Sequence, residues 1–170
     1  MAISVILGLV STQSFANGFR TDVDTWTTSG SVMFDPSTFG GAEYSFELAL
    51  GKYIDTGVMY GGKVDFLYND IITSVVGGAI CKYHFFDDEE TSAVSPYFGG
   101  FVGLAYSDVY TGNATALVLG AKLGFDLFVT ENISVDTSVG AYYATDDVYT
   151  DKDGLTNMDV VVRIGLALFF

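Results

Sequence analysis

The 170-residue chain combines a formal net charge of −14 with a hydrophobic share of 49% and a mean hydropathy of +0.37. The excess of acid excludes a nucleic-acid-binding surface, which must be basic, and the single cysteine, Cys81, excludes a framework of intrachain disulfides. A membrane-spanning helix is excluded as well, because no run reaches the roughly 18 apolar residues that a span requires.

Residues 1–16 have the pattern of a signal peptide. Ile3 to Val10 form a short apolar core, and Ser14 and Ala16 place small residues before a cleavage point after Ala16. We interpret residues 1–16 as a segment removed on export and residues 17–170 as the mature domain. The alternative is that the segment forms a buried first strand.

Eight segments follow in which every second residue is apolar, the pattern of a strand with one apolar face. Each is close to the roughly 9–11 residues that a tilted membrane strand needs. The sequence therefore predicts an all-β fold, an eight-stranded antiparallel up-and-down transmembrane β-barrel. The predicted strands are Asp24–Phe34, Glu43–Tyr53, Val58–Tyr68, Thr73–Phe85, Tyr97–Ser107, Thr115–Val129, Ile133–Ala144 and Thr156–Phe170.

Charged residues in the interiors of these segments fall on the phase opposite to the apolar one. A charge that faces lipid at mid-membrane costs about 2–4 kcal/mol, so this sorting indicates a polar interior. Lys52 is the exception, and it lies at a strand end where it can reach the interface. Four cations and four anions make up the predicted lumen network: Lys63, Lys82, Lys122, Arg163, Glu47, Asp65, Asp126 and Asp136.

The connections and the aromatic residues fit this arrangement. The predicted periplasmic turns are Ile54–Gly57, Phe86–Ser95 and Thr130–Asn132, and the predicted outer loops are Asp35–Ala42, Asn69–Ile72, Asp108–Ala114 and Thr145–Leu155. Outward aromatic residues sort into two belts, as membrane interfaces require. The periplasmic belt is Trp26, Tyr60, Tyr83, Phe85, Phe98, Phe125 and Phe170, and the outer belt is Phe34, Tyr44, Phe66, Tyr68, Tyr106 and Tyr143.

The last strand carries an apolar stripe up to its final aromatic residue: Val162, Ile164, Leu166, Leu168 and Phe170. This stripe resembles the C-terminal signal of bacterial outer-membrane barrels, which the barrel assembly machinery reads. The run Lys122–Asp136, continuing to Tyr143, resembles the closing hairpin of the OmpX/OmpW/OmpA-like barrel domains. Gly51–Tyr53 and Cys81–Phe85 resemble the ends of that family's second and fourth strands.

The resemblance covers about residues 24–170. It implies the outer membrane of a Gram-negative bacterium as the location, with outer-membrane lipid and the assembly machinery as partners. It specifies architecture and leaves any extracellular ligand or surface partner open. Short outer loops and the acidic turn Asp87–Glu90 set this chain apart from relatives that adhere through long loops.

Two functions follow from the predicted interior. A barrel of eight strands has a lumen just wide enough for side chains to fill, so a plug of ion pairs predicts a structural or surface-interaction role. The alternative is a narrow porin-like channel for small solutes. A soluble barrel of lipocalin type is a rival, but it would need the apolar phase inside.

Catalysis and cofactor binding have little support in the sequence. His84 is the only histidine, and no Ser-His-acid set at one height is expected, so we predict a satisfied lumen histidine and no enzymatic activity. A lipid-modifying enzyme remains the rival interpretation. Zinc spacing is absent, and we expect no cofactor. Asp146, Asp147, Asp151 and Asp153 could hold Ca²⁺, although a solvated acidic loop is the simpler interpretation.

Overall fold

The computed structural model describes residues 23–38, 41–85, 93–109 and 112–170, with the side chains of residues 36–38 outside that description. The proposed signal peptide, residues 1–16, and most of the predicted turn Phe86–Ser95 lie outside the described residues. Within the described ranges, no helix is long and apolar enough to cross a membrane.

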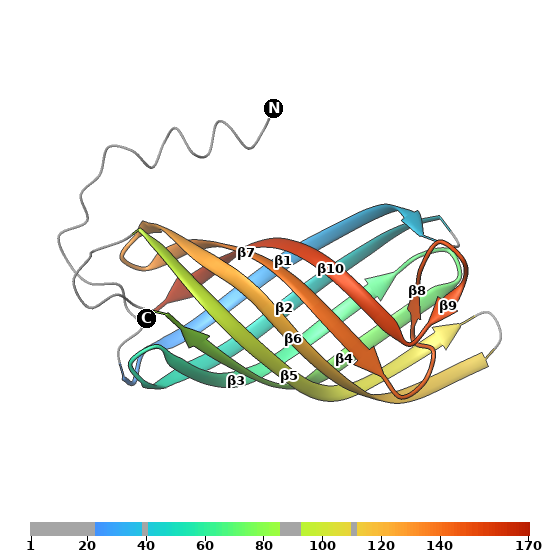
Figure 1. The fold of residues 1–170 in the computed structure, drawn as a ribbon, viewed down its shortest axis with the longest axis horizontal. Coiled ribbons are helices and arrows are strands. Elements are labelled where there is room, and N and C mark those ends of the chain that lie inside the picture. Colours follow the sequence, from blue (N-terminus) through green and yellow to red (C-terminus); the bar gives the residue numbers. More distant parts are fainter. Residues whose placement is uncertain (1–22, 39–40, 86–92, 110–111) are drawn as a thin grey trace.

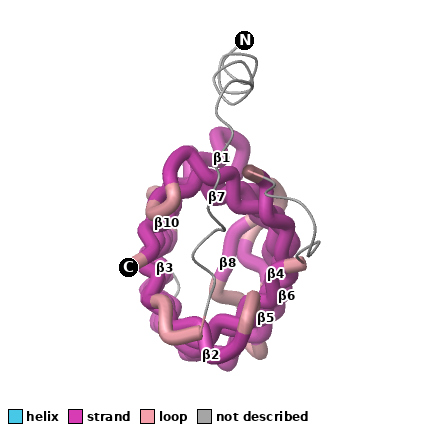
Figure 2. Tube along the Cα trace, turned by 90° about the vertical axis from the view of Figure 1, so that its left-hand side faces the viewer, coloured by secondary structure: helices cyan, strands magenta, loops and turns pink. Residues whose placement is uncertain are grey.

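Eight long strands form one closed sheet in which every neighbouring pair is antiparallel (Figures 1 and 2). The order around the barrel is β1-β10-β7-β6-β5-β4-β3-β2, so chain neighbours are also spatial neighbours. This confirms the predicted eight-stranded up-and-down barrel. The strands are β1 (Trp26–Thr38), β2 (Gly41–Asp55), β3 (Val58–Tyr68), β4 (Ile72–His84), β5 (Val94–Val109), β6 (Gly112–Thr130), β7 (Ile133–Ala144) and β10 (Met158–Phe169).

A small additional hairpin lies between β7 and β10. It consists of β8 (Tyr149–Thr150) and β9 (Leu155–Thr156) and occupies the end of the barrel away from the C-terminus (Figure 1). Seen along the barrel, β8 lies within the outline of the ring (Figure 2). We call this end the hairpin end and the opposite one the C-terminal end.

Side chains alternate between the two faces of the wall as the sequence pattern predicts. On β6, Lys122 and Asp126 face inward, whereas Leu123 and Phe125 face outward with 62% and 40% of their surface exposed. The outward phase is almost wholly apolar on every barrel strand, with Lys52 as the charged exception at a strand end, which is the reverse of a soluble barrel. Both predicted belts are outward, and neighbouring members touch: the Phe34 and Tyr44 rings lie 5.1 Å apart.

The described residues of two predicted outer loops belong to strands instead. β1 and β2 extend to Thr38 and from Gly41, and β5 and β6 extend to Val109 and from Gly112, so the loop predictions Asp35–Ala42 and Asp108–Ala114 are wrong for their described residues. Continued pairing keeps backbone groups bonded beyond the apolar region, which a loop would leave to water. Gly41 and Gly112 adopt the positive φ angles of 100° and 137° with which the second strand of each hairpin begins.

Inward glycines let bulky side chains fill the barrel. Gly99 leaves room for the long side chain of Lys122, since a Cβ there would lie 3.0 Å from Lys122 Cγ. Gly120 and Gly140 instead flank the Tyr142 ring, which a Cβ at either position would meet. At Gly78 an added Cβ would meet the Val102 carbonyl of the next strand, so the close approach of β4 and β5 requires glycine.

Candidate functional site

The interior of the barrel holds most of the buried charged side chains of the described residues. These charged side chains form two clusters. The first cluster is Glu47, Lys63, Asp65, Lys122 and Arg163, from β2, β3, β6 and β10. Glu47 and Asp65 are direct partners in the β2–β3 ladder, which places their carboxylates on one inner face. Lys63 lies two residues from Asp65 on the same strand and therefore faces the same way.

Lys63 is the shared cation of the first cluster. Its ammonium group donates to Glu47 Oε2 at 2.8 Å and to Asp65 Oδ2 at 3.2 Å, and it also donates to the Tyr142 hydroxyl at 3.2 Å. The guanidinium of Arg163 pairs with Asp65 at 2.9 Å, and Lys122 approaches Glu47 at 3.5 Å. The five side chains are only 2–13% exposed, so each charge is stabilised by its partners instead of by water.

The second cluster lies nearer the C-terminal end and centres on Lys82 and Asp136. Lys82 Nζ donates to Asp136 Oδ2 at 2.9 Å, and the Tyr97 hydroxyl donates to the same carboxylate at 2.9 Å. Lys82 also lies 4.3 Å from the centre of the Tyr97 ring, a cation–π distance. Asp126 accepts a hydrogen bond from the Ser134 hydroxyl at 2.7 Å.

His84 sits beside the second cluster with hydrogen-bond partners at both ring nitrogens. Nε2 lies 3.0 Å from the Tyr53 hydroxyl and 3.8 Å from Asp126 Oδ2, and Nδ1 lies 3.0 Å from Ser95 Oγ. The prediction that no serine, histidine and acid share one height is therefore wrong. These groups are nonetheless at most 2% exposed, so a substrate carbonyl cannot approach Ser95. The arrangement is a packed polar core.

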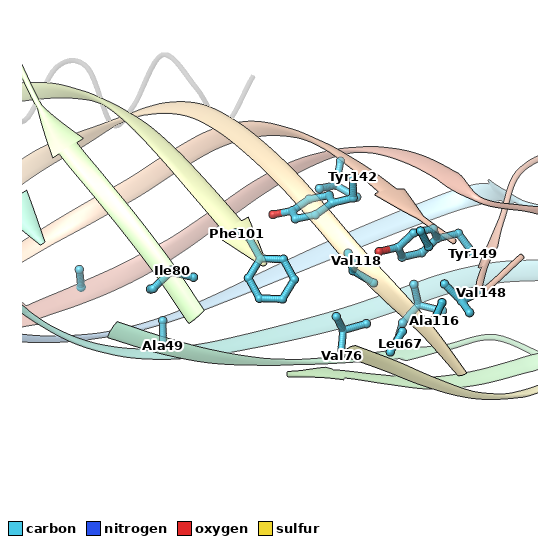
Figure 3. Packing of buried hydrophobic residues seen from close by; sticks show 14 of the residues in the cluster. Ala49, Leu67, Val76, Ile80, Phe101, Ala116, Val118, Tyr142, Val148 and Tyr149 are labelled. Carbon is cyan, nitrogen blue, oxygen red and sulfur yellow. The ribbon is translucent and has the colours of Figure 1, made fainter. Parts of the chain in front are cut away.

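Aromatic rings and small cavities complete the filling of the barrel. Phe101 and Tyr142 face each other across the interior with ring centres 6.3 Å apart, and Figure 3 shows them among the buried aliphatic side chains. Toward the C-terminal end, the Phe128 and Phe169 rings lie 5.1 Å apart. Three cavities beside the charged clusters measure about 10, 10 and 20 Å³, which is room for single water molecules.

The β8–β9 hairpin folds into the hairpin end of the barrel. Val148, Tyr149 and Thr150 are at most 5% exposed, and burial raises the pKa of the Tyr149 hydroxyl. The Thr150 hydroxyl donates to Glu43 at 2.5 Å and accepts from Asn69 Nδ2 at 3.0 Å, which ties the hairpin to β2 and to the β3–β4 turn. The hairpin residues between the loop aspartates are therefore buried in the end of the barrel.

The four loop aspartates remain on the surface. Asp146, Asp147, Asp151 and Asp153 are exposed, and they form turn hydrogen bonds, such as that from Asp153 N–H to Asp151 Oδ1 at 2.7 Å. Across the described part of the chain, no group of three or more His, Cys, Asp or Glu side chains is arranged to hold a metal ion.

Comparison with known proteins identifies the architecture. No family model and no curated protein sequence matches the chain. Among solved structures, it is similar to Neisserial surface protein A, with a TM-score of 0.62, 18% identity and coverage of 86% of this chain and 97% of that one. The fold is that of small outer-membrane barrels.

Two further outer-membrane proteins, both from Pseudomonas aeruginosa, have the same fold. The N-terminal β-barrel domain of OprF gives a TM-score of 0.60 at 15% identity, covering 88% of this chain and 98% of that one. The outer membrane protein OprG gives 0.56 at 15% identity, covering 90% and 98%. At these identities the likeness concerns the fold and not the function.

The predicted site residues of this outer-membrane-type barrel lie as follows. All eight charged residues point into the barrel, where they divide into the two clusters instead of one network. The C-terminal apolar stripe points outward along β10 and at the residue after it, with Val162, Ile164, Leu166, Leu168 and Phe170 between 46% and 63% exposed. Tyr53, Tyr97 and Tyr142 were given no role from the sequence. Their position on the polar phase, with glycines beside Tyr142, was the signal that could have found them.

Proposed function

We propose that the protein is an integral outer-membrane β-barrel with a sealed interior, a structural or surface-interaction role and no enzymatic activity. The observation that carries this proposal is the filling of the lumen by paired charges and aromatic rings. Around them the cavities hold about 10–20 Å³, whereas a conducting pore needs a continuous water-filled passage. The apolar outer surface supports contact with outer-membrane lipid of a Gram-negative bacterium.

The same proposal assigns the two ends of the barrel. The C-terminal end faces the periplasm, and the hairpin end, with its exposed aspartates, faces outward and is available to a surface partner. The outward stripe from Val162 to Phe170 is the segment that the barrel assembly machinery contacts, and its exposure supports this.

A narrow porin-like channel is the second candidate, and one observation favours it. Arg163 Nε and Nη1 are buried and lack hydrogen-bond partners within the described residues, beside the cavity of about 20 Å³ that Asp65, Asp159 and Tyr149 also line. A continuous row of such polar cavities along the barrel would form a pathway for small solutes. The cavity is separated from the C-terminal end by the Phe101–Tyr142 layer and by the second cluster, so we rank the channel below the plug.

Single-channel recording in planar bilayers tests the proposal. The sealed barrel predicts a quiet baseline with the unchanged protein. A double variant, Phe101→Ala with Tyr142→Ala, removes the rings that close the section beside Lys63 but leaves the second cluster in place, so it should stay closed as well. A porin of known conductance in the same bilayer is the positive control for detection. Discrete openings with the unchanged protein would establish the channel and overturn the plug.

A further inference from the structure

The barrel closes through an incomplete seam. The ladder between β1 and β10 runs from Thr27–Phe169 to Val32–Ile164, although both strands continue toward the hairpin end, β1 to Thr38 and β10 back to Met158. In contrast, the ladder between β1 and β2 continues to Thr38–Gly41 and that between β10 and β7 to Met158–Tyr143. The two strands separate toward the hairpin end in Figure 1.

A cleft of about 490 Å³ occupies the place where the ladder stops, and we call it the seam cleft. It is far larger than the cavities of the interior, which measure 10–20 Å³. Its volume is in the range of sites that hold small molecules. The residues that the argument uses are Met33, Phe34, Glu43, Met158, Asp159 and Val160.

The seam cleft has an apolar outer side and an acidic inner side. Phe34, Met158 and Val160 are on the outward phase and are 58%, 59% and 69% exposed, so they continue the lipid-facing surface. Glu43 lies at the inner side with 2% exposure, where Thr150 donates to one of its oxygens, and Asp159 is half-buried on the inward phase. A ligand in the cleft therefore meets hydrocarbon on one side and carboxylates on the other.

The charge of the lining residues determines which charge a ligand in the cleft must carry. Four acids, Asp35, Glu43, Asp151 and Asp159, line the cleft together with a single base, Lys152. Carboxylates accept hydrogen bonds strongly from ammonium groups, and such bonds gain strength where water is scarce. An anionic headgroup would meet repulsion at the same place.

We propose that the seam cleft binds an amphiphile with a cationic amine head and an alkyl chain, admitted from the membrane between β1 and β10. The ammonium group lies against Glu43 and Asp159, and the chain lies along Phe34, Met158 and Val160. This inference rests on the proposed membrane placement.

Methyl-labelled methionine NMR of the full chain in lipid nanodiscs tests the proposal with dodecylamine as the probe. Met33 and Met158 line the cleft, whereas Met59 is 2% exposed in the opposite half of the barrel and is an internal control. We expect saturable shifts at Met33 and Met158 and none at Met59. Dodecanoic acid, with the same chain and the opposite charge, and butylamine, with the head alone, should produce no saturable shift.

Variants of the acids separate specific binding from partition into lipid. Replacing both acids, Glu43→Gln with Asp159→Asn, should weaken dodecylamine binding by about tenfold or more, since each removes a charge-assisted contact. Asp159→Asn alone, at a half-buried position, keeps the test intact if the double variant does not fold. Asp55→Asn, an exposed acid at the C-terminal end, should leave binding unchanged.

The outcomes distinguish the inference from the proposed function. A chain that fails to enter nanodiscs refutes the membrane placement and the inference with it. A chain that enters them, yet shows equal shifts with dodecanoic acid, equal shifts at Met59 or no effect of the acid variants, overturns the seam-cleft proposal and leaves the barrel assignment standing.

Discussion

Removing Lys63, the shared cation of the first cluster, should lower the free energy of unfolding of the barrel. In Lys63→Met, the carboxylates of Glu47 and Asp65 lose their contacts at 2.8 and 3.2 Å while staying buried. Glu47 retains Lys122 at 3.5 Å and Asp65 retains Arg163 at 2.9 Å, so neither carboxylate is left without a cation. We therefore expect the low end of the cost of breaking a buried ion pair, about 3 kcal/mol.

Urea unfolding of the protein in phospholipid vesicles, followed through the fluorescence of the single tryptophan, measures this cost. The matched control is Lys52→Met, whose ammonium pairs with Asp24 at 2.7 Å but is 38% exposed as a side chain. A surface pair of that kind contributes about 0–1 kcal/mol. Glu47→Gln combined with Lys63→Met should cost less than the sum of the two single changes, by about 1–3 kcal/mol.

Two results would refute this reasoning. A loss for Lys63→Met no larger than that for Lys52→Met would mean that the interior is hydrated enough to solvate the carboxylates. Strict additivity in the double variant would mean that Lys63 and Glu47 do not interact in the folded protein.

Three further changes test other parts of the barrel. Leu123→Arg puts a charge on the lipid face and should lower the free energy of unfolding in vesicles by about 2–4 kcal/mol. Leu123→Ile adds no charge there and should leave that free energy nearly unchanged. Gly78→Val meets the Val102 carbonyl and should abolish the heat-modifiable folded band on gels, while Gly100→Val, which has open space, should keep it. Thr150→Val removes the hydrogen bond to Glu43 and should cost about 1–3 kcal/mol and expose the β8–β9 hairpin to protease. Unchanged protection would show that this hydrogen bond does not hold the hairpin in the barrel.

Alternation made most of the fold predictable from the sequence. A charge on the lipid face is costly, so the outward apolar residues Leu123 and Phe125 suffice to predict that Lys122 and Asp126 face inward. The strands β3 and β7 have the predicted bounds, Val58–Tyr68 and Ile133–Ala144. The extensions of β1, β2, β5 and β6 were missed because pairing continues beyond the apolar region, where polar residues no longer carry a membrane pattern.

The candidate sites were less accessible to sequence reasoning. Which cation meets which carboxylate depends on the ladder register, such as Glu47 opposite Asp65, and alternation does not specify register between strands. The Ser95–His84–Asp126 arrangement joins β4, β5 and β6 and was missed for the same reason. The seam cleft depends on where one ladder ends, after Val32–Ile164, and the strand pattern continues beyond that point without a break.

The most direct test of the membrane barrel is to measure whether lipid surrounds position 123, near the middle of β6. In a Trp26→Phe background, Leu123→Trp places the only tryptophan on the proposed lipid face. Reconstituted with lipids brominated on their acyl chains, this variant should be strongly quenched and emit at short wavelength. Emission that brominated lipid leaves unchanged would contradict the outward apolar face and, with it, the membrane barrel.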